Sequence, residues 1–466
     1  MLMIKFMLPK RKLAVVMLLI SFSAAFIYIL YKQTSFYPYR VNTDYNYNFQ
    51  NTNAEISNLT LVNGQLKLPN YDSEAQSSFL KVNISSTLIG RYFQPSIKII
   101  SGNQSFIQYF EHGAKGVRYL NISSIPFSNE GKVEFQGKNI LVDDQLVQLI
   151  SFKNPNINKQ KILFISPHPD DAEIAAFGFY SDNKESYVIT ITAGDAGGYK
   201  YASVYKDGPE HFLKKGELRT WNSLAVPQLG GISPERTLNL GFFDTTLVKM
   251  AREKDKVIGG LYTNTEDINT YRKQNSSRLS LGLSGSSNWN SLVENLSYLL
   301  KEIKPDIIVT PHPMLDSHPD HKFSTIALLH AINSSEIYPE SLYLYTNHFS
   351  LNEYYPYGEI GGIISLPPNF SDKWNFDSIY SHSLSSDKQK DKIFALDAMN
   401  DLRPSTEWRF LKGTIKMSLR KVRNYFLKKE TNYFDRSVRS NELFFVVKIN
   451  KSNKKNIVEK LIETWQ

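Results

Sequence analysis

Short apolar runs and amphipathic helical patterns alternate through the larger, C-terminal part of this chain. Three predominantly apolar runs occupy 161–166, 187–192 and 306–310. Before the third run, the apolar residues of 289–303 recur at three- and four-residue spacing, which is typical of an amphipathic helix. Apolar strands separated by helices indicate a largely parallel sheet with helices on both faces. We therefore expect an α/β domain over 158–466, with ligands bound beyond the carboxyl ends of its strands.

The preceding region, 35–157, has the pattern of an all-β domain. Leu80, Val82 and Ile84 alternate with polar neighbours, and similar short stretches follow, separated by turns rich in Gly and Asn. This spacing predicts a small β-sandwich-like domain. At 466 residues the chain also exceeds the size at which one core usually stops growing, so two domains are expected. Because all five Trp lie outside this region, a packing or spacer role is favoured over sugar binding.

The N-terminus has the pattern of a membrane anchor. Basic residues between Lys5 and Lys12 precede the uncharged apolar run 13–31, which has about the length of a membrane-spanning helix. The pattern predicts an anchor within 1–34, a cytoplasmic N-terminus, and a single-pass protein of the cytoplasmic membrane with its bulk outside the cytoplasm. The alternative is a cleaved signal peptide, with Ser23 and Ala25 near the cleavage site.

Composition excludes several classes of site. The chain has no cysteine, so disulfides, thiolate nucleophiles and cysteine-bound zinc are all excluded. The net charge of +9 suits an anionic membrane surface or an acidic glycan, but it is spread thinly and no nucleic-acid-binding motif accompanies it. We therefore expect no nucleic-acid partner, and any metal must be held by His and carboxylate side chains.

Two clusters of His and Asp directly follow two of the predicted strands. The first is 168-HPDD-171 and the second is 311-PHPMLDSHPDHK-322. Because the carboxyl ends of parallel strands meet at one edge of a sheet, the clusters should lie together. Two imidazoles and a carboxylate, with one position open for water, form a common catalytic zinc site, although iron oxygenases use the same ligands. Each cluster also has a residue to spare, Asp170 and His318, for acid–base work or oxyanion stabilisation. Helix capping explains either cluster alone, but the pair together predicts a metal site.

The segments 168-HPDDAE-173 and 316-DSHPDH-321 resemble the PIG-L/LmbE-like family of zinc-dependent N-acetylglucosaminyl deacetylases. The resemblance implies a Rossmann-like α/β fold over most of the chain and one Zn²⁺, although another divalent metal is possible. The roles that it implies are metal ligands at His168, Asp171 and His321, a general base at Asp170, an oxyanion-stabilising His318 and an orienting Asp316.

Weaker features extend the resemblance. Arg219 in 216-GELRTW-221 and Asp244 in 238-LNLGFFDTTL-247 correspond to family positions that contact substrate hydroxyls. The chain departs from the family where Asn222 replaces an acidic residue, and where 175-AAFGF-179 replaces a glycine pair. These departures bear on the substrate more than on the chemistry.

The sequence therefore predicts a zinc-dependent N-deacetylase acting on an N-acetylated amino sugar of a surface glycan, polysaccharide or glycolipid. Two alternatives stay open: a non-catalytic glycan-binding protein that retains the metal site, and a metal-dependent enzyme with another reaction, such as hydrolysis of a non-sugar amide. The oligomeric state is not predicted. His312 and His348 are further candidates for lining the site.

Overall fold

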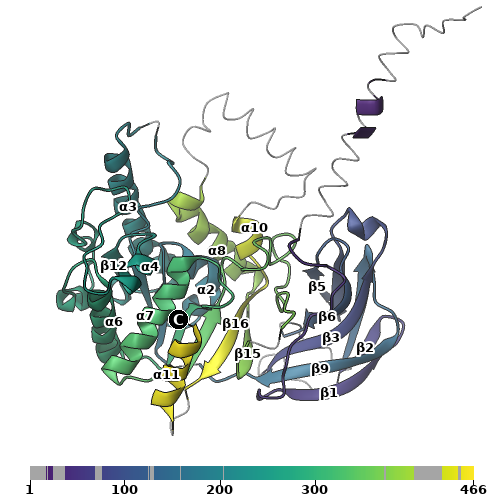
Figure 1. The fold of residues 1–466 in the computed structure, drawn as a ribbon. Helices are drawn as coiled ribbons and strands as arrows, with labels where there is room; N and C mark the ends of the chain where they lie inside the picture. The colour runs from purple at the N-terminus through teal and green to yellow at the C-terminus, as the bar shows by residue number, and fades with distance from the viewer. Residues whose placement is uncertain are drawn as a thin grey trace, which may run out of the picture.

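The computed structural model describes most of the chain beyond residue 36. The described residues are a few between 17 and 24, then 37–68, 76–123, 125, 131–157, 159–202, 204–371, 374–403, 433–449 and 453–465. They form two bodies, an N-terminal β-domain and a larger α/β domain (Figure 1).

A seven-stranded mixed sheet is the centre of the α/β domain. Its order is β12-β11-β10-β13-β14-β16-β15; the first five strands run parallel, and β16 is antiparallel to both of its neighbours. The strands are β10 (Ile162–Ser166), β11 (Ser186–Thr192), β12 (Thr237–Phe242), β13 (Ile307–Pro311), β14 (Ser341–Tyr345), β15 (Ser378–Ser383) and β16 (Asn441–Lys448). The predicted largely parallel sheet is therefore present.

Helices cover both faces of this sheet, as the continuous apolar strands require. Leu163 and Ile165 of β10 point into one apolar cluster with α6 and α7, whereas Ile162 and Phe164 point into another with α2 and α8. The helices are α2 (Asp171–Ser181), α3 (Gly208–Ala225), α4 (Leu247–Arg252), α5 (Asn269–Arg272), α6 (Trp289–Ile303), α7 (Pro319–Ser335), α8 (Ser386–Ala398), α10 (Tyr433–Ser437) and α11 (Lys454–Trp465).

The order of the strands brings the two His–Asp clusters together. From β10 the chain adds β11 and β12 on one side, then returns to place β13 on the other side of β10. Ile162 pairs with Ile307 and Phe164 with Val309, so the loops after both strands leave the sheet side by side. In open α/β sheets, such a switch point is where ligands bind.

The β-domain consists of two antiparallel sheets around one core, as predicted. One sheet has the order β1-β9-β3-β6, with β8 paired to β3, and the other has the order β2-β7-β4-β5. The strands are β1 (Glu55–Leu61), β2 (Gln65–Lys67), β3 (Gln76–Ser86), β4 (Ser96–Ser101), β5 (Gln104–Tyr109), β6 (Lys115–Asn121), β7 (Lys132–Lys138), β8 (Ile140–Leu141) and β9 (Gln145–Lys153). Apolar residues of both sheets meet in a single cluster, so this is a sandwich.

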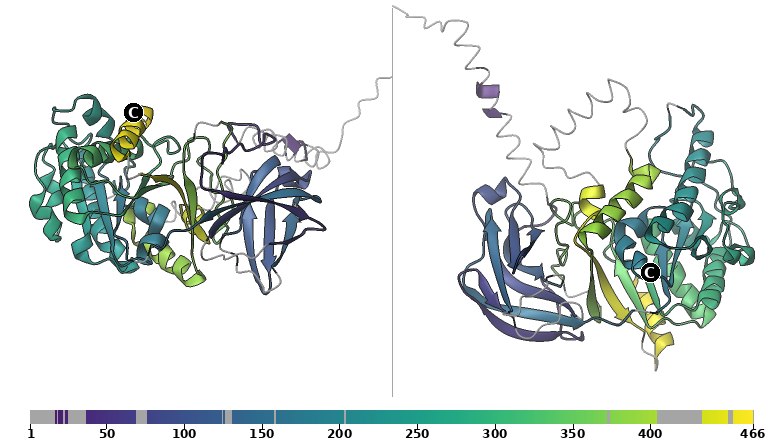
Figure 2. Two further views of the ribbon diagram at one scale, coloured as in Figure 1. Left: turned by 90° about the horizontal axis from the view of Figure 1, so that it is seen from below. Right: turned by 180° about the vertical axis from the view of Figure 1, so that it is seen from behind.

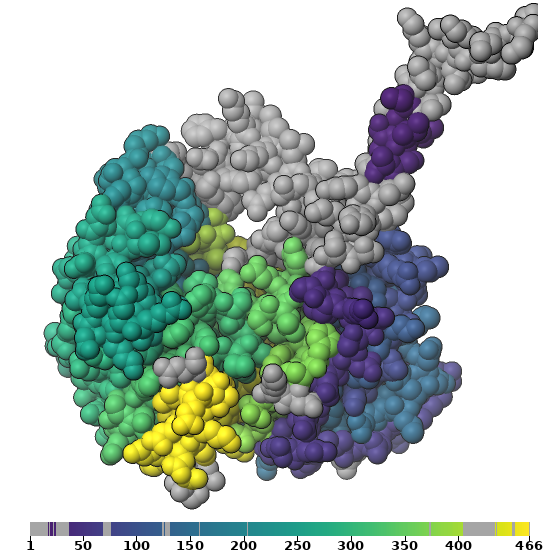
Figure 3. Space-filling view, in the orientation of Figure 1, coloured from purple at the N-terminus to yellow at the C-terminus, as the bar shows by residue number. Residues whose placement is uncertain are grey.

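The two domains share buried surface. Tyr47, Phe79 and Phe152 of the N-terminal part belong to the same apolar cluster as the helices α6 and α7. Asn121 donates hydrogen bonds to Ile364 O and to Ser381 Oγ, at 2.7 and 3.0 Å. Other views show the same close packing, with the green stretch between β14 and β15 against the β-domain (Figures 2 and 3). The β-domain is thus packed against the larger domain, and a role in sugar binding gains no support.

The predicted membrane anchor and location are corrected. Among the residues that the structure describes, no helix combines the length and the apolar character needed to cross a membrane. This finding contradicts the single-pass location in the cytoplasmic membrane, although most of 13–31 lies outside the described residues. The domain limits at 34/35 and 157/158 stay predictions.

Candidate metal centre

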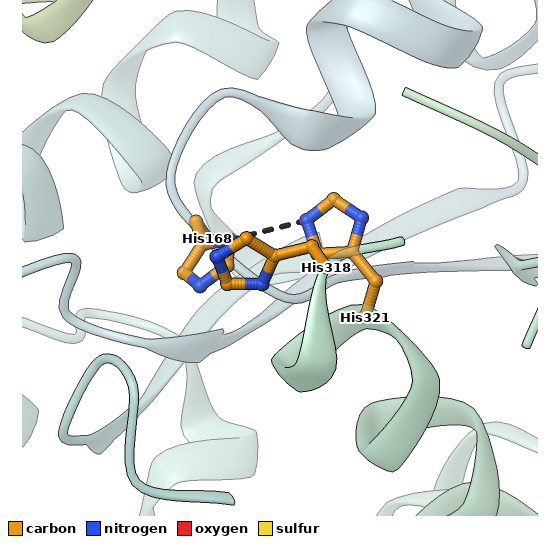
Figure 4. A group of neighbouring side chains, drawn as sticks. All are labelled: His168, His318 and His321. Carbon is orange, nitrogen blue, oxygen red and sulfur yellow. Dashed lines mark hydrogen bonds between the residues drawn. The ribbon is translucent and has the colours of Figure 1, made fainter. Parts of the chain in front are cut away.

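Three donor atoms from the two predicted clusters converge at the switch point. His168 Nδ1 lies 3.1 Å from Asp171 Oδ2 and 3.2 Å from His321 Nε2, and His321 Nε2 lies 3.1 Å from Asp171 Oδ2. The loop after β10 carries His168, α2 begins at Asp171, and the first turn of α7 carries His321. Figure 4 shows the imidazoles of His168, His318 and His321 facing one another.

This triangle fits a small divalent cation. Zinc binds imidazole nitrogen and carboxylate oxygen at about 2.0–2.2 Å, so two of its ligands in tetrahedral geometry lie about 3.3 Å apart. The three sides measured here, 3.1 to 3.2 Å, are close to that value. The three side chains are also nearly excluded from solvent, at 7%, 2% and 0% exposure, so the donors are held in place before a metal binds.

Carboxylates behind both imidazoles fix which nitrogen is free to bind metal. His168 Nε2 lies 3.1 Å from Asp244 Oδ1 and 3.3 Å from Asp320 Oδ2, which places its proton on that nitrogen. His321 Nδ1 lies 3.0 Å from Asp316 Oδ2. The nitrogens facing the triangle, His168 Nδ1 and His321 Nε2, are therefore the ones that would lose a proton and give their lone pairs to a metal. Such orienting partners are usual behind metal-binding histidines.

The field in the site is strongly negative without a metal. Burial alone lowers the pKa of His321, but Asp171 and Asp316 outweigh it and raise the pKa to about 10. The pKa of His168 is likewise raised well above its ordinary value, because Asp244, Asp171 and Asp320 outweigh the effect of burial. A cation between the donors would satisfy this field, so both the charge and the geometry of the site fit a metal.

Asp170 is held in an unusual backbone conformation beside the triangle. Its φ of 136° is one that residues with side chains rarely adopt, at a cost of about 1–3 kcal/mol. Arg219 Nη2 stabilises the turn by donating to Asp170 Oδ2 and to Pro169 O, both at 2.9 Å. Burial raises the pKa of Asp170 to about 7, although Arg219 lowers it. Stored strain at such a position is typical of a functional residue.

His318 caps α7 and thereby has a defined tautomer. Its Nδ1 accepts from the backbone N–H of Asp320 at 3.2 Å, so the ring proton sits on Nε2. Burial, followed by the neighbouring His168 and His321, lowers the pKa of His318. The ring is therefore a neutral donor at neutral pH and not an imidazolium. Its ring centre lies 4.7 Å from that of His168.

The two predicted substrate-binding residues lie at the site but are engaged by other side chains. Arg219 binds Asp170, and Asp244 contacts His168 and lies 4.0 Å from Arg219 Nη1. Both are buried, at 7% and 6% exposure. Contact with substrate hydroxyls stays a prediction for each, and this geometry gives both an additional part in holding the site together.

The sequence analysis missed two residues that position the metal ligands. Asp320 lies in the second motif; besides its contact with His168, it accepts from the backbone N–H of Thr245 at 2.6 Å. Asn347 donates to Asp171 Oδ1 at 2.8 Å and follows β14. Its position after another parallel strand, next to His348, was a signal that could have identified it. His312 instead packs against Phe445 and Trp465, away from the triangle.

A third missed residue, Asp401, comes from the short 3₁₀ segment Asn400–Leu402 after α8. Its carboxylate lies 3.6 Å from Arg219 Nη1 and 3.5 Å from Lys215 Nζ. Asn222, the residue that departs from the family pattern, donates to Ala398 O and accepts from the backbone N–H of Asn400. Asn222 therefore holds the segment that brings Asp401 to Arg219. No local sequence signal predicted this contact.

Asp195 gives a pH-dependent contribution to stability. It accepts from the backbone N–H of Asp244 at 2.8 Å, and burial, followed by the charge of Asp244, raises its pKa to about 7. Since an unfolded Asp titrates near 4, the folded state holds the proton more tightly, and stability falls as pH rises between about 4 and 7.

The variant Asp195→Asn has no carboxyl group to titrate, so its stability should not fall in this way. We expect its free energy of unfolding to be about 2–4 kcal/mol higher than that of the wild type at pH 8, with little difference near pH 4. Thermal unfolding across this pH range measures the difference. Asp143→Asn, at an exposed position, is the control. A stability difference between Asp195→Asn and the wild type that does not change with pH would contradict the raised pKa of Asp195.

A candidate metal centre with a spare carboxylate and a neutral donor, at the switch point of a doubly wound sheet, is the arrangement expected of a hydrolytic metalloenzyme. Residues 163–332 match the family PIG-L, described as GlcNAc-PI de-N-acetylase, which confirms the resemblance seen in the two motifs. This part of the α/β domain is thus similar to the metal-dependent N-acetyl sugar deacetylases. No curated protein matches the chain.

Several solved structures are similar to part of this chain, at low identity and low TM-score. A triple mutant of the deacetylase Orf2 of the teicoplanin biosynthetic pathway is 15% identical, with a TM-score of 0.33, and covers 62% of this chain and 99% of its own. The A40926 pseudoaglycone deacetylase Dbv21 is 17% identical, with a TM-score of 0.32, covering 62% and 98%. GalB, the 4-carboxy-2-hydroxymuconate hydratase of Pseudomonas putida KT2440, is 13% identical, with a TM-score of 0.28, covering 61% and 95%. Likenesses this distant do not bear on the substrate.

Proposed function

We propose that the protein is a zinc-dependent N-deacetylase that hydrolyses the acetamide of an N-acetylated amino sugar in a glycan, polysaccharide or glycolipid. The observation that supports it best is the triangle of His168 Nδ1, Asp171 Oδ2 and His321 Nε2, with sides of 3.1 to 3.2 Å. Asp170 and His318 stand beside this triangle and are not needed to complete it.

His168, Asp171 and His321 would hold the zinc ion. Bound zinc supplies a Lewis acid, which polarises the acetamide carbonyl and lowers the pKa of water to roughly 7. Three further side chains orient these ligands: Asp316 contacts His321, Asp320 contacts His168, and Asn347 donates to Asp171.

The acid–base work falls to Asp170 and His318. Asp170 takes a proton from the water whose oxygen attacks the carbonyl carbon, and His318 Nε2–H donates to the oxyanion that forms. When the C–N bond breaks, Asp170 returns the proton to the departing nitrogen, so acetate and a free amine leave. Arg219 keeps Asp170 turned toward the site by binding its Oδ2. A glycan-binding protein without turnover would have no use for this strained carboxylate.

Release of acetate and amine from a panel of N-acetylated sugars, oligosaccharides and glycolipids tests the proposal, with metal content measured on the same protein. We expect about one zinc per chain, activity that chelation removes, and recovery with added zinc. Binding of sugars without any release of amine would support the non-catalytic alternative. Iron as the tightly bound metal, or release of amine from non-sugar amides alone, would support the other.

Asp401 is expected to affect turnover through Arg219. Asp401→Asn removes the carboxylate 3.6 Å from Arg219 Nη1, so the guanidinium that holds Asp170 loses one of its anionic partners. We expect kcat to fall about ten- to hundredfold, as small misplacements of catalytic groups do, with KM nearly unchanged. Asp397→Asn removes an exposed ion pair with Arg403 at the end of α8, just before the segment that carries Asp401, and is the matched control. Equal kcat values in the two variants would show that Asp401 has no such effect.

A further inference from the structure

The outer face of α3 borders an open pocket of about 670 Å³. Pockets that bind small molecules have volumes of roughly 300–1,000 Å³, so its size suits a sugar. Its walls combine aromatic and polar side chains: Tyr201, Tyr205, Lys214, Glu217, Leu218, Lys273 and Gln274. The helix stands at the edge of the α/β domain that is remote from the β-domain (Figure 1).

A series of contacts connects the pocket to the metal centre. Tyr201 follows Lys200, whose Nζ donates to Asn400 O and lies 3.9 Å from Asp401 Oδ1. Asp401 in turn contacts Arg219, the partner of Asp170. Burial, followed by the charge of Asp401, raises the pKa of Tyr201. A chain of sugar units could therefore run from the metal centre onto the face of α3.

An exposed tryptophan lies on this face of the helix. Trp221 follows Leu218 by three residues, so both project on the same side of α3. Its exposed fraction is 55%, whereas Trp289 and Trp465 are buried at 3% and 5%. A large aromatic ring left in water, one turn from a pocket lined by two tyrosines, is the kind of surface on which the apolar face of a ring-shaped ligand stacks.

We propose that Tyr201, Tyr205 and Trp221 form a subsite for pyranose units of the glycan that neighbour the N-acetyl sugar at the metal centre. The proposal rests on the proposed deacetylase function. The aromatic rings cover the C–H faces of the sugars. Polar groups for their hydroxyls come from Lys273, from Gln274, whose Nε2 also donates to Glu217 O, and from Glu217, which also pairs with Lys214. A second copy of the chain would need a larger and more apolar face than this hollow, partly charged surface.

Comparison of a long and a short probe tests the subsite. The probes are N-acetylglucosamine and its β-1,4-linked tetramer, and binding is measured by calorimetry on the full chain with Asp170→Asn, so that nothing is turned over. We expect Trp221→Ala and Tyr205→Ala each to weaken binding of the tetramer about tenfold and to leave binding of the monomer unchanged. Trp221→Phe keeps a ring and should lose less. In the active enzyme, the tetramer-to-monomer ratio of kcat/KM should fall by the same factor.

Controls separate this proposal from the function on which it rests. Tyr92→Ala removes an exposed ring of the β-domain and should change neither probe; thermal unfolding checks that each variant is folded. If neither probe is deacetylated, tetramer binding that depends on Trp221 still supports the subsite. The subsite proposal is overturned if the tetramer does not bind, or if its binding is unchanged in both pocket variants. It is also overturned if the protein is a dimer that Trp221→Ala converts to monomers, because a second copy of the chain would then occupy this face.

Discussion

Replacement of Asp170 by asparagine is expected to lower kcat about 10²- to 10⁴-fold, the usual contribution of a general base, while KM changes little. An amide cannot take the proton of the attacking water or return it to the leaving amine. Asparagine still fills the space of Asp170 and its side-chain oxygen can still accept from Arg219, so the fold should be retained. Initial rates of acetate release on any sugar that the wild type accepts measure the effect.

The adjacent aspartate provides the contrast. Asp171→Asn weakens one corner of the donor triangle and the contacts with both histidines, so we expect zinc content itself to fall. Asp170→Asn should keep its zinc, because its side chain is not one of the three donors. An Asp170→Asn protein with full activity would exclude Asp170 as the base. Loss of zinc in that variant would place the residue among the ligands.

Substitution of Lys392 by methionine is expected to destabilise the protein by about 3–5 kcal/mol, the cost of leaving a buried charge unpaired. Lys392 Nζ lies 2.7 Å from Glu442 Oε1, and both side chains are 1% exposed. The Glu442 oxygens also accept from the backbone N–H groups of Gly178 and Phe179, each at 2.9 Å. Those amides follow a break in α2 at Ala176, where φ is −147°. The pair therefore supports the helix that begins with Asp171, one of the three proposed metal ligands.

A double-mutant cycle checks this account. In Lys392→Met/Glu442→Gln the buried charge is gone and the amide oxygen can still accept from one backbone N–H, so most of the lost stability should return. Lys390→Met, which removes an exposed partner of Asp387 on the same helix, should change stability by less than about 1 kcal/mol. Chemical unfolding monitored by circular dichroism gives each value. A Lys392→Met protein as stable as the Lys390→Met control would show that the ion pair has no net effect.

Local pattern predicted the core of the α/β domain well. The expected strands at 161–166, 187–192 and 306–310 differ by no more than one residue at either end from the observed β10, β11 and β13. The helix expected over 289–303 has those limits. Such strands and helices are specified by periodicity and by capping, which neighbouring residues determine.

Other contacts were not predicted from the sequence. Asp401 lies far along the chain from Arg219 and stands in no recognisable motif. Asn347 lies far along the chain from Asp171, and only its position after a parallel strand, next to His348, could have identified it. The apolar cluster shared by the two domains was not predicted either. The alternation of apolar and polar residues in 35–157 predicts that one face of each strand is buried, but not which part of the chain covers that face. The lowered pKa of His318 is a further example, because it results from burial and from two neighbouring imidazoles.

The sequence by itself determined the strand-ending motifs, and hence which side chains could bind a metal, because a strand delivers what directly follows it to one edge of a sheet. The tertiary structure decided how those side chains are held. The pairing of β10 with β13 closed the donor triangle, and Asp244, Asp316 and Asp320 fixed its tautomers. These contacts depend on distances between segments remote in sequence, which only the packed sheet and its helices set.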